Sequence, residues 1–270
     1  MNIRKFAKQF EQKYPRQLAE GWDNTGILID AEDTFTKMLV CIDITEEVID
    51  EAIAKECKGI LAYHPTLFKA FKRVVPDTRS QKLCIRLIKN GISVYSPHSA
   101  LDSINGGIND WLASIVSGEP ITTTSVPKYT KAIEGTPSDI SIGAGRYVTL
   151  EEGISINEMI QRVKEGLQVP LRYALPPKYD GNEKIKTIAI CCGSGASMFR
   201  NRCADVVLTG EMGHHEVLEH LEWNTSVILS EHTNTERGYL KHWIPYLHEL
   251  IPSVEFIQST EDKSPLIYMN

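Results

Sequence analysis

Short apolar segments alternate with amphipathic ones along this chain, and this alternation constrains the fold more than any other feature. In the first half, Met38–Ile44, Gly59–Tyr63 and Ile92–Ser96 have the length and composition of buried strands. Thr45–Lys55 and Arg79–Asn90, which separate them, have the spacing and end signals of helices. Strands that alternate with helices form largely parallel sheets with helices on their faces. The sequence therefore predicts an α/β fold.

The alternation continues beyond a stretch of different composition. Residues 117–145 are rich in Thr, Pro and Gly, which indicates a linker with edge strands. The remaining strands are expected at Thr187–Cys191, Asp205–Leu208, Ser226–Leu229 and Val254–Gln258, and the remaining helices at 3–10, 109–116, 156–166, 213–221 and 235–250. We predict two domains, one formed by residues 1–120 together with 225–270 and a middle one formed by residues 121–224.

Charge and hydropathy exclude several classes of protein. The 270 residues carry 29 Lys and Arg against 35 Asp and Glu, a net charge of −6, with no basic cluster. Duplex binding requires a concentrated basic surface, so direct nucleic-acid binding is not expected. No apolar run reaches the length of a membrane span, and the N-terminus lacks the apolar core of a secretory signal. A cytoplasmic location is expected, with the nucleus or the mitochondrion as alternatives.

Six cysteines, at positions 41, 57, 84, 191, 192 and 203, show no CxxC spacing. Most of them fall inside apolar segments, so we interpret them as buried free thiols in a reducing compartment. A disulfide framework or a zinc ribbon is not expected.

Histidines and carboxylates gather immediately after the expected strands. His64 follows one strand, His98 and Asp102 follow another, and His232 and Glu236 follow a third. Thr209-Gly210-Glu211, with His214 and His215 close behind, follow a fourth. Because ligands of open α/β sheets bind beyond the carboxyl ends of the strands, this placement predicts a site there. Imidazole and carboxylate together are the donors of a divalent metal.

Two interpretations of these residues stay open. His232 and Glu236 are four residues apart, a spacing that puts both on one face of a helix and lets them meet one ion. The same pair is also an ordinary contact on a helix surface, and a histidine at a strand end is commonly a hydrogen-bonded structural residue. The alternative to a metal site is therefore a set of structural polar residues.

Other candidate residues have structural interpretations. The turn Cys192–Ser197 could offer backbone N–H groups to an anion, but it lacks the lysine of a P-loop, so a tight structural turn is the preferred interpretation. We interpret Trp22 and Trp111 as packing anchors rather than as stacking platforms.

Several short motifs together resemble those of one known family. They are Trp22-Asp23-Asn24-Thr25-Gly26, Tyr63-His64-Pro65, His98-Ser99-Ala100-Leu101-Asp102, Gly106-Gly107-Ile108-Asn109-Asp110, Gly145-Arg146, Thr209-Gly210-Glu211 and the pair His232 and Glu236. In this order they resemble the motifs of the NIF-three-like, or YbgI-like, family over residues 20 to 245.

The resemblance implies a two-domain α/β fold with mixed or parallel sheets, a dinuclear metal centre and a toroidal homohexamer. By motif position, the metal ligands would be His64, Asp102, His232 and Glu236, and His98 would transfer protons or contact substrate. Zn, Mn and Fe all suit such a donor set. Many members have a histidine at the position of Tyr63. A tyrosine there resembles the eukaryotic branch of the family. A phenol is a poor ligand because its pKa is about 10, so the second metal position would be weak or would be completed by water.

Two functions are compatible with this resemblance. Members are often labelled homologues of GTP cyclohydrolase I type 2, and eukaryotic relatives are described as interacting factors in transcription. The first hypothesis is a metal-dependent hydrolase that acts on a small nucleotide-like or pterin-like substrate. The alternative is a non-enzymatic interaction or scaffold factor with a transcription-related protein partner, or a metal-responsive protein. Whether the chain is an enzyme stays open at this point.

Overall fold

The computed structural model describes residues 1–121, 127–136, 139–200, 204–267 and 269. Thr122–Ser125, Pro137 and Cys203, on which parts of the sequence interpretation fall, lie outside the described residues. The chain forms two compact units. Unit 1 comprises residues 1–101 and 239–270, and unit 2 comprises residues 102–238.

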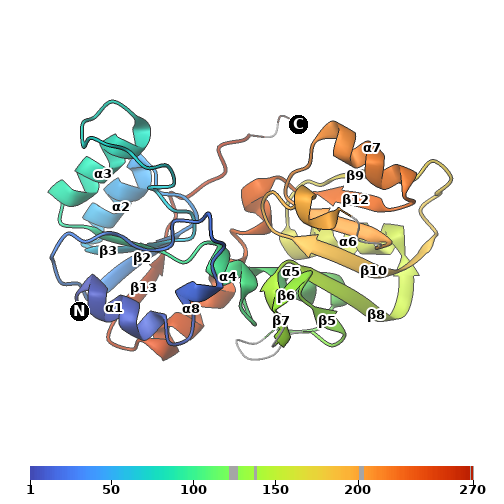
Figure 1. The fold of residues 1–270 in the computed structure, drawn as a ribbon, viewed down its shortest axis with the longest axis horizontal. Coiled ribbons are helices and arrows are strands. Elements are labelled where there is room, and N and C mark those ends of the chain that lie inside the picture. The colour runs from blue at the N-terminus through green and yellow to red at the C-terminus, as the bar shows by residue number, and fades with distance from the viewer. Residues whose placement is uncertain (122–126, 137–138, 201–203, 268, 270) are drawn as a thin grey trace. The chain divides into compact units, whose positions relative to one another are not determined.

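Unit 1 contains a five-stranded sheet with the order β1-β4-β3-β2-β13 (Figure 1). Its strands are β1 (Gly26–Ile29), β2 (Lys37–Cys41), β3 (Gly59–Ala62), β4 (Ser93–Ser96) and β13 (Glu255–Gln258). The four strands β4, β3, β2 and β13 are parallel, and β1 is antiparallel to β4.

Helices cover both faces of this sheet. They are α1 (Ile3–Phe10), α2 (Glu46–Ala54), α3 (Arg79–Lys89) and α8 (Tyr239–Leu250). The apolar sides of α2 and α3 pack on one face, where Val48 and Leu87 join the core with Leu39 of β2. On the opposite face, Phe10 of α1 lies edge-on to Tyr95 of β4 and to Trp243 of α8. Alternate residues of each strand therefore serve two separate helix layers.

Unit 2 contains a six-stranded mixed sheet with the order β5-β8-β10-β11-β12-β9 (Figure 1). Its strands are β5 (Thr130–Lys131), β8 (Arg146–Ser155), β9 (Arg172–Ala174), β10 (Lys184–Cys191), β11 (Val206–Thr209) and β12 (Ser226–Leu229), and a separate hairpin is formed by β6 (Glu134–Thr136) and β7 (Asp139–Ala144). The neighbouring strands β10, β11 and β12 pair in parallel, so their carboxyl ends lie at one edge.

The helices of unit 2 are α5 (Ile108–Ser117), α6 (Ile156–Leu167) and α7 (His214–Glu222), and the sequence boundary between the units falls within the short α4 (Ser99–Ser103). Short 3₁₀ turns are η1 (Arg16–Leu18), η2 (Ala196–Phe199) and η3 (His232–Thr235). The predicted α/β class, with mixed and parallel sheets, is confirmed.

A buried ion pair joins α5 to β8 within unit 2. Arg146 is 0% exposed, and its guanidinium contacts both carboxylate oxygens of Asp110, at 2.5 and 3.1 Å. It also donates to the carbonyl oxygens of Gly143, Gly145 and Ile104. Both motifs that contain these charged residues therefore have an architectural role in the fold.

Contacts group two segments differently from the sequence-based domain boundaries. Residues 102–120 and 225–238 belong to unit 2, whereas the prediction counts them with the first domain. The predicted linker region of residues 117–145 contains β5, β6 and β7. The expected last helix begins at Tyr239 rather than at residue 235, because residues 232–235 form η3 instead.

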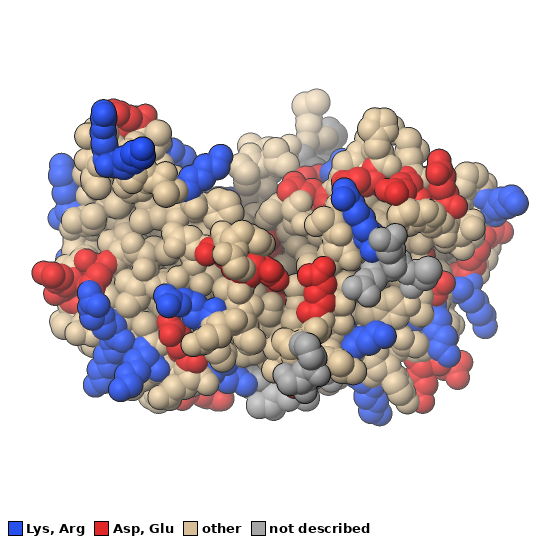
Figure 2. Space-filling model, viewed as in Figure 1, with Lys and Arg blue, Asp and Glu red and all other residues tan. Residues whose placement is uncertain are grey.

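The cysteines, the helix lengths and the surface charges can be compared with the expectations from composition. Five free cysteines, at positions 41, 57, 84, 191 and 192, are buried, as expected. In the part of the chain that the structure describes, no helix is both long and apolar enough to span a membrane. Figure 2 shows basic and acidic side chains interspersed on the visible face.

Glu51 of α2 holds the segment that follows β13 in unit 1. Its carboxylate accepts hydrogen bonds from Lys55, from the Ser259 hydroxyl and from the Thr260 N–H and hydroxyl. Burial by itself disfavours the ionised carboxyl, but these bonds outweigh burial and lower the pKa of Glu51 from 4.5 to about 2.

The Glu51 contacts make unit 1 sensitive to acid. Because the folded pKa is depressed, the stabilisation is complete above pH 4.5 and is lost as the pH falls toward 2. We expect Glu51→Gln to lower the free energy of unfolding by about 2–3 kcal/mol at pH 7, and by much less near pH 2. Thermal unfolding at both pH values measures this, with exposed Glu249→Gln as the control. An equal loss at both pH values would contradict the prediction.

Candidate metal centre

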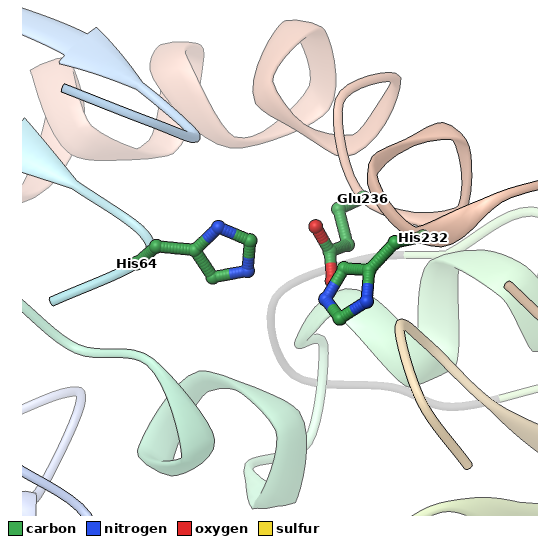
Figure 3. A group of neighbouring side chains, drawn as sticks. All are labelled: His64, His232 and Glu236. Carbon is green, nitrogen blue, oxygen red and sulfur yellow. The ribbon is translucent and has the colours of Figure 1, made fainter. Parts of the chain in front are cut away.

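In unit 1, the carboxyl end of the parallel sheet carries a histidine–carboxylate pair. His64 follows β3, and its Nδ1 lies 3.0 Å from Oδ1 of Asp43, which follows the neighbouring β2. The contact involves Nδ1, so this imidazole would coordinate a metal through Nε2 (Figure 3). Asp43 is a positioning residue that the sequence interpretation missed. Its place after a buried strand was the available signal.

A second pair in unit 1 holds His98. Its Nδ1 lies 2.8 Å from Oδ1 of Asp23, and the other oxygen of Asp23 accepts hydrogen bonds from the N–H and hydroxyl of Ser99. Burial alone would raise the pKa of Asp23, but the bonds from His98 and Ser99 lower that pKa below the usual carboxyl value. An ionised Asp23 fixes the His98 ring, which suits a group that transfers protons.

Tyr63 packs against both of these histidines. Its ring centroid lies 5.0 Å from that of His64 and 5.4 Å from that of His98, and the residue is 2% exposed. Tyr63 therefore supports the orientation of both imidazoles by packing.

In unit 2, the pair His232 and Glu236 meets at the end of β12. His232 Nε2 lies 3.3 Å from Oε1 of Glu236, and the two side chains point toward each other (Figure 3). The expected contact forms, although η3 rather than an α-helix places the two residues. His232 Nδ1 lies 2.9 Å from Glu211, the glutamate of the Thr-Gly-Glu motif after β11. Glu211 therefore has the same relation to His232 as Asp43 has to His64.

Asp102 is tied to the end of β10 in the same unit. Cys192 Sγ donates to Oδ1 of Asp102 at 3.4 Å, while Asn109 accepts from the Cys192 N–H and donates to the Asp102 carbonyl. Burial raises the pKa of the adjacent Cys191 thiol, and the charges of Asp102 and Glu236 raise it further. The negative charges of Asp102 and Glu236 therefore both disfavour ionisation of the Cys191 thiol at the end of β10.

Gly193 leaves space beside the His232–Glu236 pair. A Cβ at this position would lie 2.8 Å from Oε1 of Glu236 and 2.9 Å from Nε2 of His232. Gly193 has a φ of +62°, which other residues rarely adopt. Imidazole and carboxylate atoms that adjoin a position without a side chain fit a metal ion in their donor chemistry.

Two N–H groups of the turn after β10 donate to threonine hydroxyls of the same unit. The N–H of Gly193 donates to the Thr235 hydroxyl at 2.8 Å, and that of Gly195 donates to the Thr209 hydroxyl at 3.0 Å. These bonds agree with a structural turn rather than an anion-binding one. His214 and His215 are exposed at the start of α7 and belong to no cluster of three metal-ligand side chains among the described residues.

One expectation about aromatic residues is wrong. Trp111 is 4% exposed and is a packing anchor as predicted, but Trp22 is 65% exposed. The buried neighbour of Trp22 is instead the aspartate of the motif, whose side chain is 0% exposed in the Asp23–His98 contact. This turn directs the Asp23 carboxylate into the protein and the Trp22 indole toward solvent.

Comparison with known proteins places the chain in a family. The yeast protein NGG1-interacting factor 3 from Saccharomyces cerevisiae is 38% identical over 255 residues, covering 88% of this chain and 86% of that protein. NIF3-like protein 1 of Drosophila melanogaster is 35% identical and covers 96% and 87%.

Solved structures share the fold at lower identity. Hypothetical protein SA1388 of Staphylococcus aureus has a TM-score of 0.84 at 22% identity, covering 100% of this chain and 99% of that chain. Reduced HcgD of Methanocaldococcus jannaschii has a TM-score of 0.78 at 22% identity, covering 96% and 97%. The sequence model of Duf34/NIF3 (NGG1p interacting factor 3) matches residues 1–265, and the chain therefore belongs to this family.

Proposed function

We propose that this chain is a divalent-metal-binding protein with His64, Asp102, His232 and Glu236 as ligands, and that it is a metal-dependent hydrolase. The observation that carries the proposal is the pairing of each candidate histidine ligand with a carboxylate from a neighbouring strand end, Asp43 for His64 and Glu211 for His232. Such carboxylates orient metal-binding imidazoles and raise their basicity. His64, His232 and Glu236 each offer one ligand atom of a type that could hold an ion.

The proposed reaction is hydrolysis of a small nucleotide-like or pterin-like molecule. Two divalent ions, of Zn, Mn or Fe, supply an activated water and charge stabilisation when bound. The chain's own contribution is the Asp23–His98 pair, in which Asp23 holds Nδ1 and directs Nε2 to accept or donate a proton. Tyr63 in place of a further histidine makes the second metal position the weaker one.

Elemental analysis tests the metal centre. Protein purified without chelator or His-tag is expected to carry about two metal equivalents, and His232→Ala and Glu236→Ala are expected to lose them. Glu211→Gln should weaken affinity by about 10- to 100-fold, as loss of an orienting carboxylate does. Exposed His215→Ala is the control. About one equivalent would indicate a single ion, and no metal in the wild type would overturn the assignment.

Turnover tests the hydrolase separately. Asp102→Asn is expected to abolish hydrolysis in a panel of nucleotides and phosphoesters while leaving the circular-dichroism spectrum unchanged. No turnover by fully metal-loaded wild type across this panel would contradict the hydrolase proposal.

A second candidate function is a non-enzymatic interaction factor. It is favoured by the name of the yeast relative, which describes that protein as interacting with NGG1. On this reading the partner is a transcription-related protein, and the metal stabilises the fold or reports metal supply. Metal-site variants would then keep partner binding as long as they fold. For either function we propose a homohexamer and a cytoplasmic location, with the nucleus or mitochondrion as alternatives.

A further inference from the structure

Two large aromatic side chains are exposed beside each other in unit 1. Trp22 is 65% exposed and Phe68 is 51% exposed. Their ring centroids lie 6.1 Å apart at an interplanar angle of 69°. Exposed aromatic side chains that cluster, unlike single ones scattered over a surface, commonly mark a binding site.

Both rings contact His98, a residue of the proposed mechanism. Trp22 lies edge-on to His98 with centroids 6.0 Å apart at 78°, and Phe68 lies edge-on to the same ring at 6.3 Å and 90°. His98 is itself held by the buried side chain of Asp23, the residue next to Trp22. The two exposed rings therefore adjoin His98, the partly exposed member of the proton-transfer pair, within this unit.

A hydrogen bond connects the two segments that carry the rings. The side-chain amide of Asn24 donates to the carbonyl oxygen of Leu67. Each of these residues is close in sequence to one ring, Asn24 to Trp22 and Leu67 to Phe68. The segment before β1 is thus fastened to the segment after β3, and the relative placement of the rings is part of the fold.

We propose that Trp22 and Phe68 form a stacking site for a planar heteroaromatic ring, such as the base of a nucleotide, beside His98. This inference rests on the proposed hydrolase function and assigns the residues that would bind the ring of its substrate. Heteroaromatic rings stack on exposed indole and phenyl faces without needing a specific hydrogen-bond pattern. A ring held there would bring the rest of its molecule next to the His98 imidazole.

The test compares two probes that differ by the ring. Guanosine 5′-monophosphate and ribose 5-phosphate are titrated into the metal-loaded full chain by isothermal titration calorimetry. We expect guanosine 5′-monophosphate to bind at least about 5-fold more tightly, since stacking on one aromatic side chain contributes a factor of about 5 to 150. Trp22→Ala should remove this difference and leave ribose 5-phosphate binding unchanged, and Trp22→Phe should restore most of it.

Trp223→Ala is the matched control, because Trp223 is also exposed, at 45%, but lies in unit 2. Equal affinity for both probes, or an unchanged difference in Trp22→Ala, would overturn the inference. So would a Trp22→Ala variant that changes only the oligomeric state in sedimentation, since the rings would then contact another copy. Ring-dependent binding without turnover would count against the hydrolase alone. Turnover with an unaltered KM in Trp22→Ala would count against the stacking site alone.

Discussion

Arg146→Met is expected to lower the free energy of unfolding of unit 2 by about 3–5 kcal/mol. The substitution leaves the Asp110 carboxylate buried and without its cation, and both side chains are at most 1% exposed. It also removes the donor to three carbonyl oxygens around the start of β8. Urea unfolding, with hydrogen exchange to assign the loss to unit 2, measures the effect.

A second arginine serves as a control that distinguishes the effect of burial on stability from the effect of removing a positive charge. Arg200 also pairs with a glutamate in unit 2, at 3.6 Å, but its side chain is 66% exposed. Arg200→Met should change stability by less than about 1 kcal/mol. The double variant Arg146→Met with Asp110→Asn should recover part of the loss because it removes the stranded charge. An Arg146→Met variant as stable as Arg200→Met would refute the role given to this pair.

Gly193→Ala is expected to weaken metal binding by at least about 10-fold, the lower end of what disturbed metal-site residues cause. Its Cβ would lie within 2.9 Å of both Glu236 Oε1 and His232 Nε2, so one or both groups must move. Competition titration of Zn²⁺ against a chromophoric chelator reports the affinity.

A second glycine with a positive φ serves as the control that separates backbone strain from displacement of His232 and Glu236. Gly118 also has a positive φ, +75°, but the nearest atom to its Cβ would be Arg162 Nη1 at 3.7 Å. Gly118→Ala should cost stability, by about 1 kcal/mol, and leave Zn²⁺ affinity unchanged. Equal affinity losses in both variants would show that strain, not displacement of the pair, is responsible.

Much of the fold follows from local pattern. Ser226–Leu229 is a strand at the predicted bounds, and helix α2 begins after Thr45, whose hydroxyl accepts from Val48 as a cap should. The long strand β8 was not predicted, because it lies between the expected linker of residues 117–145 and the expected helix at 156–166. Its residues Glu151 and Glu152 are exposed, so the strand lacks a continuous apolar pattern, and pairing with β10 rather than local preference defines it.

The candidate ligands could be proposed from the sequence, whereas the carboxylates that contact the candidate histidines could not. His64 and His232 stand out because each follows a strand end. Asp43, Asp23 and Glu211 are recognisable only once neighbouring strands bring them to a histidine from 21 to 75 residues away. The exposure of Trp22 was missed for a related reason. An indole next to a buried aspartate is indistinguishable from a core indole until the direction of the turn is known.

The sheet order of unit 1 has a consequence for synthesis on the ribosome. Strand β13 pairs with β2, yet it is made only after all of unit 2 has been translated. Until then β2 presents an unpaired edge. Helix α8, whose Trp243 packs on Phe10 on one face of the sheet, is also missing. Unit 2, which is continuous in sequence, can mature first as the chain emerges. The half-made first unit is therefore the nascent form that most needs protection by chaperones.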